Sequence, residues 1–90
     1  MEIKTYREMF DVPPYEGYED IVGMAYYKLP RGERGCWVVR YCGKDIWELL
    51  FRPDTADNEK LIERFTDEIL AKKAGRKLFL NSWGITKEDV

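Results

Sequence analysis

Histidine is absent from this chain of 90 residues, which holds only two cysteines and four prolines. Without histidine, the Ser-His-Asp and Cys-His nucleophile systems and most zinc sites are excluded. Cys36 and Cys42 share one strand-like run, which puts them about 20 Å apart, too far for a disulfide. The single Gly-Lys pair, Gly43-Lys44, is followed by Asp45, so it does not match a phosphate-binding loop. We therefore predict a protein that is not an enzyme and uses no metal or cofactor.

Long apolar runs are also missing from the sequence. None reaches the roughly 18 residues that a membrane-spanning helix needs, and the acidic start Met1-Glu2-Ile3 does not open a signal peptide. With 44% hydrophobic and 36% charged residues, the chain is typical of a folded, soluble protein. Its length allows one small domain, residues 1–90, for which we expect a cytoplasmic location.

Three strand-like runs occupy the middle of the chain. They span about 21–29, 36–42 and 46–52, and the short links between them predict an antiparallel meander. A three-residue loop between the second and third runs sets Arg40 opposite Glu48. The same register gathers six large side chains on one face, namely Trp37, Val39, Tyr41, Trp47, Leu49 and Phe51.

A helix is predicted from about 56 to 74. Asp54 and Asp57 suit its N-terminus, and Gly75 suits a left-handed stop. Its apolar stripe covers the aromatic sheet face, which gives an α+β fold. The predicted core consists of Trp37, Trp47, Phe51, Leu61, Phe65 and Ile69.

The two ends of the chain are less regular. Residues 4–10 have the spacing of a short helix, which Pro13-Pro14 must stop, and 11–20 read as an extended acidic connector. A short extra strand is possible at 78–80. Residues 83–90 form a C-terminal tail with the pattern of a helix start.

The connector carries the main functional hypothesis. Its second part, residues 15–20, places two tyrosines among three carboxylates, a composition suited to docking on a basic protein surface. The alternative is an ordinary solvated loop whose tyrosines pack on the sheet. In composition the chain resembles small acidic inhibitors or adaptors encoded by phages or mobile elements, such as those that act on nucleic-acid-binding host proteins. The candidate protein-binding residues are Tyr15, Glu16, Tyr18, Glu19 and Asp20.

Nucleic-acid binding through the sheet face is the competing hypothesis. Trp37, Asp54-Thr55 and Leu80-Asn81 are similar in placement to the integrase arm-binding type of three-strand-plus-helix domain, which implies DNA reading by the exposed sheet face, although these positions identify no family. The basic candidates also have structural interpretations: Arg40 faces Glu48, and the cluster from Lys72 to Lys77 suits a helix C-terminus. The full set is Lys28, Arg40, Lys44, Arg52, Lys72, Lys73, Arg76 and Lys77.

The second sheet face bears on assembly. It carries Val38 and Leu50 and is more apolar than a solvated face usually is. We expect the N-terminal segment to fold back over it, which favours a monomer over a homodimer.

Overall fold

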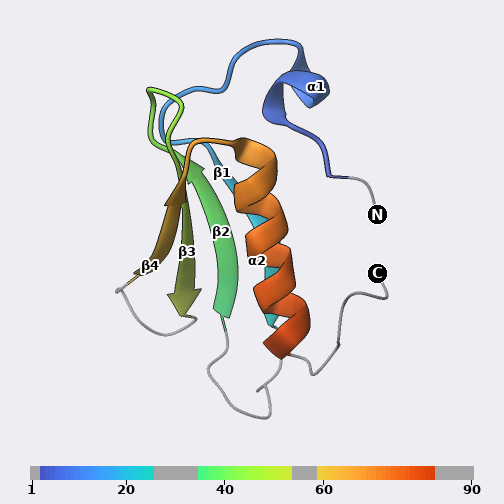
Figure 1. The fold of residues 1–90 in the computed structure, drawn as a ribbon, viewed down its shortest axis with the longest axis vertical. Coiled ribbons are helices and arrows are strands. Elements are labelled where there is room, and N and C mark those ends of the chain that lie inside the picture. The colour runs from blue at the N-terminus through green and yellow to red at the C-terminus, as the bar shows by residue number, and fades with distance from the viewer. Residues whose placement is uncertain (1–2, 26–34, 54–58, 83–90) are drawn as a thin grey trace.

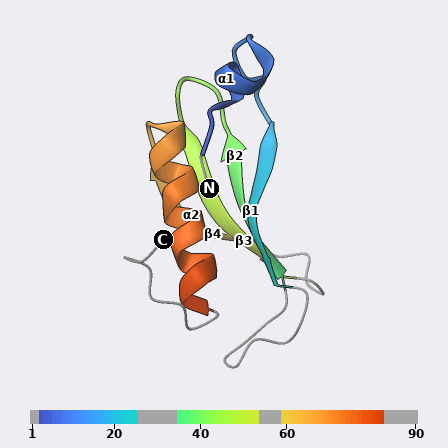
Figure 2. The ribbon, with the colours of Figure 1, turned by 90° about the vertical axis from the view of Figure 1, so that its right-hand side faces the viewer.

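The computed structural model describes residues 3–25, 35–53 and 59–82. They form α1 (Tyr6–Phe10), β1 (Glu19–Ala25), β2 (Gly35–Tyr41), β3 (Trp47–Pro53), β4 (Lys60–Phe65) and α2 (Glu68–Ser82). The four strands make one antiparallel sheet in the order β1-β2-β3-β4. Helix α2 lies across one face of the sheet, and α1 lies beyond one end of it (Figures 1 and 2). The predicted α+β class is confirmed, while residues 26–29 of the first predicted strand and the tail at 83–90 fall outside the described residues.

The β2–β3 hairpin has the predicted register. Arg40 pairs with Glu48 and Tyr41 with Trp47. The Cys42 N–H donates to the Ile46 carbonyl at 2.8 Å, which closes a loop of three residues, 43–45, all with positive φ. One-face burial of the large side chains therefore decided the alignment.

The core lies between this face and α2. Its buried residues are Trp37, Val39, Trp47, Leu49 and Ala71. Of the remaining predicted core residues, Phe51 and Phe65 are half-buried against this cluster, and Ile69 is half-buried. Leu61 was wrongly included, because 47% of it is exposed.

The predicted helix at 56–74 is wrong in its first half. Lys60–Phe65 form β4, which pairs with β3, and α2 begins only at Glu68. The spacing of Leu61, Ile62 and Phe65 fits a helical stripe, but it also fits a strand with an extra residue at Ile62, where the register shifts. Pairing with β3 satisfies backbone groups that would otherwise stay unpaired at an open edge. The cap of α2 comes from Asp67, whose Oδ2 accepts a hydrogen bond from the Leu70 N–H at 3.0 Å.

Gly75 does not end the helix. It is buried within α2, where an added Cβ would lie 2.5 Å from Val22 Cγ2 and 2.9 Å from Leu49 Cδ1. Glycine is needed here because it lets α2 approach the sheet closely. The predicted strand at 78–80 is also wrong, since these residues belong to α2 and two of them, Leu78 and Phe79, pack against the core.

Candidate functional site

The short helix α1 is fixed at both ends by local hydrogen bonds. Thr5 Oγ1 accepts from the Glu8 N–H at 3.1 Å, and Glu8 Oε1 accepts from the Thr5 N–H at 2.8 Å. This reciprocal capping lowers the pKa of the Glu8 carboxyl. At the other end Asp11 adopts the left-handed conformation with φ of 61°. A helix of only five residues is thereby given a defined start and stop.

A chain of aromatic rings joins α1 to the core. The ring centroid of Tyr6 lies 4.6 Å from those of both Phe10 and Tyr18, and 6.1 Å from that of Tyr15. Tyr18 continues the chain to the buried Trp47 at 6.4 Å. Burial, with smaller contributions from nearby carboxylates, raises the pKa of Tyr18 to about 12. The N-terminal segment is therefore anchored by ring packing that reaches the sheet.

Four apolar or aromatic side chains of this segment remain exposed, and we call them the N-terminal patch. Their exposed fractions range from 43% for Met9 to 62% for Tyr15. Such a set on adjoining residues is typical of a contact surface rather than of scattered surface hydrophobics. The patch consists of Met9, Phe10, Val12 and Tyr15.

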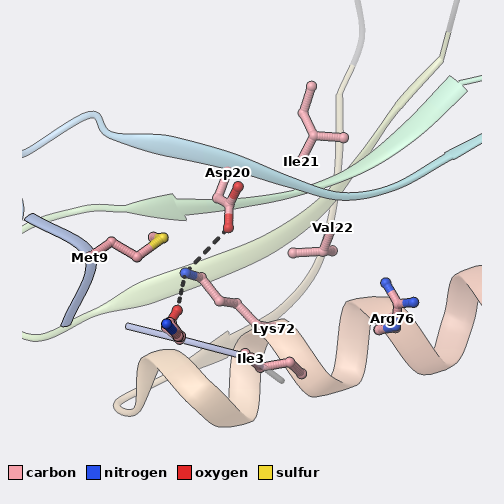
Figure 3. Close-up of a pocket in the computed structure, with 8 residues that line it drawn as sticks. Ile3, Met9, Asp20, Ile21, Val22, Lys72 and Arg76 are labelled. Carbon is pink, nitrogen blue, oxygen red and sulfur yellow. Dashed lines mark hydrogen bonds and ion pairs between the residues drawn. The ribbon is translucent and has the colours of Figure 1, made fainter. Parts of the chain in front are cut away.

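A group of polar contacts centred on the buried Lys72 ties the same segment to α2, and we call it the polar latch. It consists of the side chains of Lys72, Glu68 and Asp20 with the Lys4 carbonyl and the Tyr6 N–H. The Lys72 ammonium, only 3% exposed, lies 2.7 Å from Glu68 Oε2. It also lies 3.2 Å from Asp20 Oδ2 and donates to the Lys4 carbonyl at 2.9 Å (Figure 3). Glu68 Oε2 also accepts from the Tyr6 N–H at 2.7 Å. All three protons of Lys72 thus have an acceptor, as a buried charge requires.

An open cavity of about 260 Å³ lies beside the latch, between β1, α2 and the N-terminal segment (Figure 3). Two of its polar lining groups, Asp20 and Lys72, already bind each other. We therefore take the patch rather than the cavity as the candidate site. The cavity is lined by Ile3, Lys4, Met9, Asp20, Ile21, Val22, Lys72 and Arg76.

Of the five predicted protein-binding residues, two are exposed and three are packed or ion-paired within the chain. Tyr15 is exposed within the patch, and Glu16 is exposed beside the hairpin loop at Gly43. Tyr18 is half-buried in the ring chain, in agreement with the alternative that the tyrosines pack on the sheet. Asp20 belongs to the polar latch, and Glu19 binds two arginines of the second sheet face. Glu19 and Asp20 therefore have partners within the chain.

The arginines predicted to bind nucleic acid are also engaged. Arg40 Nη2 lies 2.9 Å from Glu19 Oε2 and 2.6 Å from Glu59 Oε1. Arg52 donates to the same two carboxylates at 2.8 and 2.6 Å. We call these four side chains the arginine-glutamate network. Arg40 was expected to pair with Glu48, whose carboxylate instead accepts from Arg64 at 2.9 Å, so only the predicted register holds and not the ion pair.

The network shifts the pKa of each of its members. Hydrogen bonds from Arg40 lower the pKa of Glu59. Partial burial alone raises the pKa of Glu19, but the hydrogen bonds from Arg52 and Arg40 outweigh it and lower that pKa. Hydrogen bonds to the carboxylates raise the pKa of both arginines. All four groups are thus held in their charged forms.

The arginine-glutamate network lies on the second sheet face, beside a buried apolar pair. Val38 and Leu50 pair at its centre and are 0% and 2% exposed. Arg40 and Arg52 flank this pair from opposite ends, and both guanidinium groups bind Glu19 and Glu59. The N-terminal segment, predicted to cover this face, binds α2 through the polar latch instead.

The other predicted basic residues are scattered. Lys72 is buried in the polar latch, Lys44 is in the hairpin loop, and Lys28 lies outside the described residues. The cluster of Lys72, Lys73, Arg76 and Lys77 does not form the last turn of a helix, because α2 continues to Ser82.

Sequence reasoning missed most of the N-terminal patch. Met9, Phe10 and Val12 were assigned to a short helix and its stop, and this segment was expected to cover the second sheet face rather than to meet a partner. The signal available was the capping box Thr5-x-x-Glu8, which marks an ordered helix start directly before these residues.

Two further kinds of site, for metal ions and for membranes, concern the described ranges 3–25, 35–53 and 59–82. In these ranges no group of three or more cysteine and carboxylate side chains could hold a metal ion. Neither α1 nor α2 is long and apolar enough to cross a membrane. Comparison with known protein families, curated proteins and solved structures gives no match.

Proposed function

We propose that this protein is a non-enzymatic protein-binding module whose contact surface is the N-terminal patch. The supporting observation is that Phe10 and Tyr15, 55% and 62% exposed, rest on a ring chain that reaches the buried Trp47. Exposed aromatic side chains held in place before binding lose little conformational freedom when a partner closes over them.

The acidic groups beside the patch indicate the chemistry of the partner. Glu8, Asp11 and Glu16 are all exposed, and Arg7 is the basic side chain among them. We infer a partner that offers an apolar pocket for the aromatic rings and basic groups at its rim. This keeps Tyr15 and Glu16 of the acidic, tyrosine-bearing surface inferred at residues 15–20 and extends that surface to α1. The inhibitor or adaptor role stays a prediction.

Site-specific photocrosslinking in cells of the source organism tests the proposal. A photoreactive phenylalanine analogue is introduced separately at Phe10, at Tyr15 and, as a control, at Lys77, which is exposed on α2. Positions 10 and 15 should crosslink to the same protein, and position 77 should not.

A second variant then separates a real contact from a chance crosslink. Asp11→Asn combined with Glu16→Gln should reduce capture of the crosslinked partner and make it less sensitive to salt, since the partner is inferred to be basic. Equal crosslinking from all three positions, or none from 10 and 15, would show that the patch is not the contact surface.

A further inference from the structure

Strand β4 forms the second edge of the sheet. Figure 1 shows α2 in front of β1 and β4 at the opposite edge of the sheet. Residues 60–64 are exposed, including Leu61 at 47% and Ile62 at 42%. The opposite edge strand, β1, shares an open cavity at residues 20–22 with Ile3, Lys4 and Met9 of the N-terminal segment. Edge strands with open backbone groups are templates for pairing with a further strand.

The charges of β4 are arranged symmetrically about its apolar centre. The strand reads Lys60-Leu61-Ile62-Glu63, with a basic residue on one side of the apolar pair and an acidic residue on the other. If two copies run antiparallel with Leu61 opposite Ile62 of the second copy, each Lys60 faces a Glu63. Opposite charges directly across two strands stabilise their pairing.

The bulge in β4 makes this alignment geometrically possible. In a regular strand, residues three apart point to opposite faces, so Lys60 and Glu63 could not oppose each other in a symmetric pair. In β4 the extra residue at Ile62 shifts the alternation by one, so Lys60 and Glu63 point to the same face. Lys60 pairs with Phe51 and Glu63 pairs with Leu49, and these two partners lie on the face that α2 covers. Lys60 and Glu63 therefore share one face and the same phase of backbone hydrogen bonding.

These two charges are also available for such a contact. Among the residues that the structure describes, neither Lys60 nor Glu63 forms an ion pair, whereas the adjacent Glu59 and Arg64 are engaged with Arg40, Arg52 and Glu48. We propose that two copies of this chain associate through β4, antiparallel and about a two-fold axis, with Lys60 of each copy opposite Glu63 of the other. This surface is distinct from the N-terminal patch, so the two proposals stand or fall separately.

Sedimentation velocity over a range of protein concentrations tests the proposal with five proteins and one mixture. Lys60→Glu and Glu63→Lys each turn two attractive contacts into two repulsive ones and should weaken self-association by roughly tenfold or more. The double variant Lys60→Glu/Glu63→Lys restores opposite charges and should dimerise as the native chain does. An equimolar mixture of the two single variants should form a heterodimer, because one variant is acidic at both positions and the other is basic at both. Lys73→Glu, on α2, is the matched control.

The mixture gives the sharpest result. Recovery of association on mixing two variants that are monomeric alone supports antiparallel pairing in this register. A native chain that stays monomeric at all concentrations would overturn the proposal. The bulge and the charges would then prevent β4 from pairing with a further strand. A dimer that both single reversals leave unchanged, or that Lys73→Glu weakens equally, would overturn it as well.

Discussion

Replacing Lys72 by methionine tests whether the polar latch holds the N-terminal segment in place. Methionine keeps most of the apolar stem but removes an ammonium that contacts Glu68, Asp20 and the Lys4 carbonyl. Among the described residues, Glu68, itself buried, would then keep one donor, the Tyr6 N–H. Removing one partner of a buried ion pair costs about 3–5 kcal/mol, because the other charge is left uncompensated.

The lower end of that range is expected here. Asp20 is 36% exposed at its side chain and the adjacent cavity is open, so water can partly solvate the remaining carboxylates. A loss of about 3 kcal/mol is a large part of the roughly 5–15 kcal/mol that stabilises a domain. For a chain of this length it corresponds to a fall in Tm of roughly 12–24 °C.

Urea unfolding and thermal melting of Lys72→Met measure this loss directly. Lys73→Met, on the exposed side of the same helix, is the control and should change stability by less than about 0.5 kcal/mol. Adding Glu68→Gln to Lys72→Met should recover part of the loss, because glutamine is neutral yet still accepts from Tyr6. A loss below about 1 kcal/mol for Lys72→Met, or an equal loss in both single variants, would refute the reasoning.

Three further predictions concern the rest of the molecule. Glu59→Gln should destabilise the domain by up to about 1 kcal/mol at neutral pH, measured by urea unfolding, since the network is partly exposed to solvent. The pKa values of Glu59 and Glu19 are lowered, so the stability from the arginine-glutamate network is present above the ordinary carboxyl pKa and is lost as the pH falls. The free energies of unfolding of the native chain and of Glu59→Gln should therefore converge in acid. A difference that stays constant from pH 7 into acid would contradict this. In an absorbance titration Tyr18 should ionise near pH 12, and Tyr18→Phe should remove this late step; the stability that accompanies its raised pKa is present below pH 10 and lost between pH 10 and 12. Gly75→Ala should lower Tm, because overpacking at about 1–3 kcal/mol outweighs the gain of about 1 kcal/mol in helix propensity; a higher Tm would show that α2 does not approach the sheet closely at that point.

The candidate site was only partly predictable. Tyr15 and Glu16 were found from composition, because tyrosine and carboxylates together are typical of contact surfaces. Glu19 and Asp20 belong to the same run, yet they bind basic groups of β2, β3 and α2 that are remote in the sequence. These remote basic groups decide whether a carboxylate is free to bind a partner protein or is paired within its own chain. The local sequence pattern does not predict where these groups lie.

The alternation of large and small side chains determined much of the sheet by itself. Trp37, Val39 and Leu49 had to share a buried face with Trp47, and only one hairpin register achieves this. The proline pair after α1 likewise fixed where the first helix must end. These features depend on contacts between residues that are near in sequence, so the sequence alone carries them.

The tertiary structure alone decided the second half of the fold. Leu61, Ile62 and Phe65 suit a helix stripe as well as a bulged strand, and the choice fell to the strand because β3 offers an edge of backbone groups to pair with. Because α2 packs across β1 and β3, Gly75 lies against Val22 and Leu49, and Lys72 is buried. Hydrogen bonding along a strand edge and close packing between the helix and the sheet are interactions between residues remote in the sequence. Their free energies outweigh the intrinsic preference of a short segment for helix or strand.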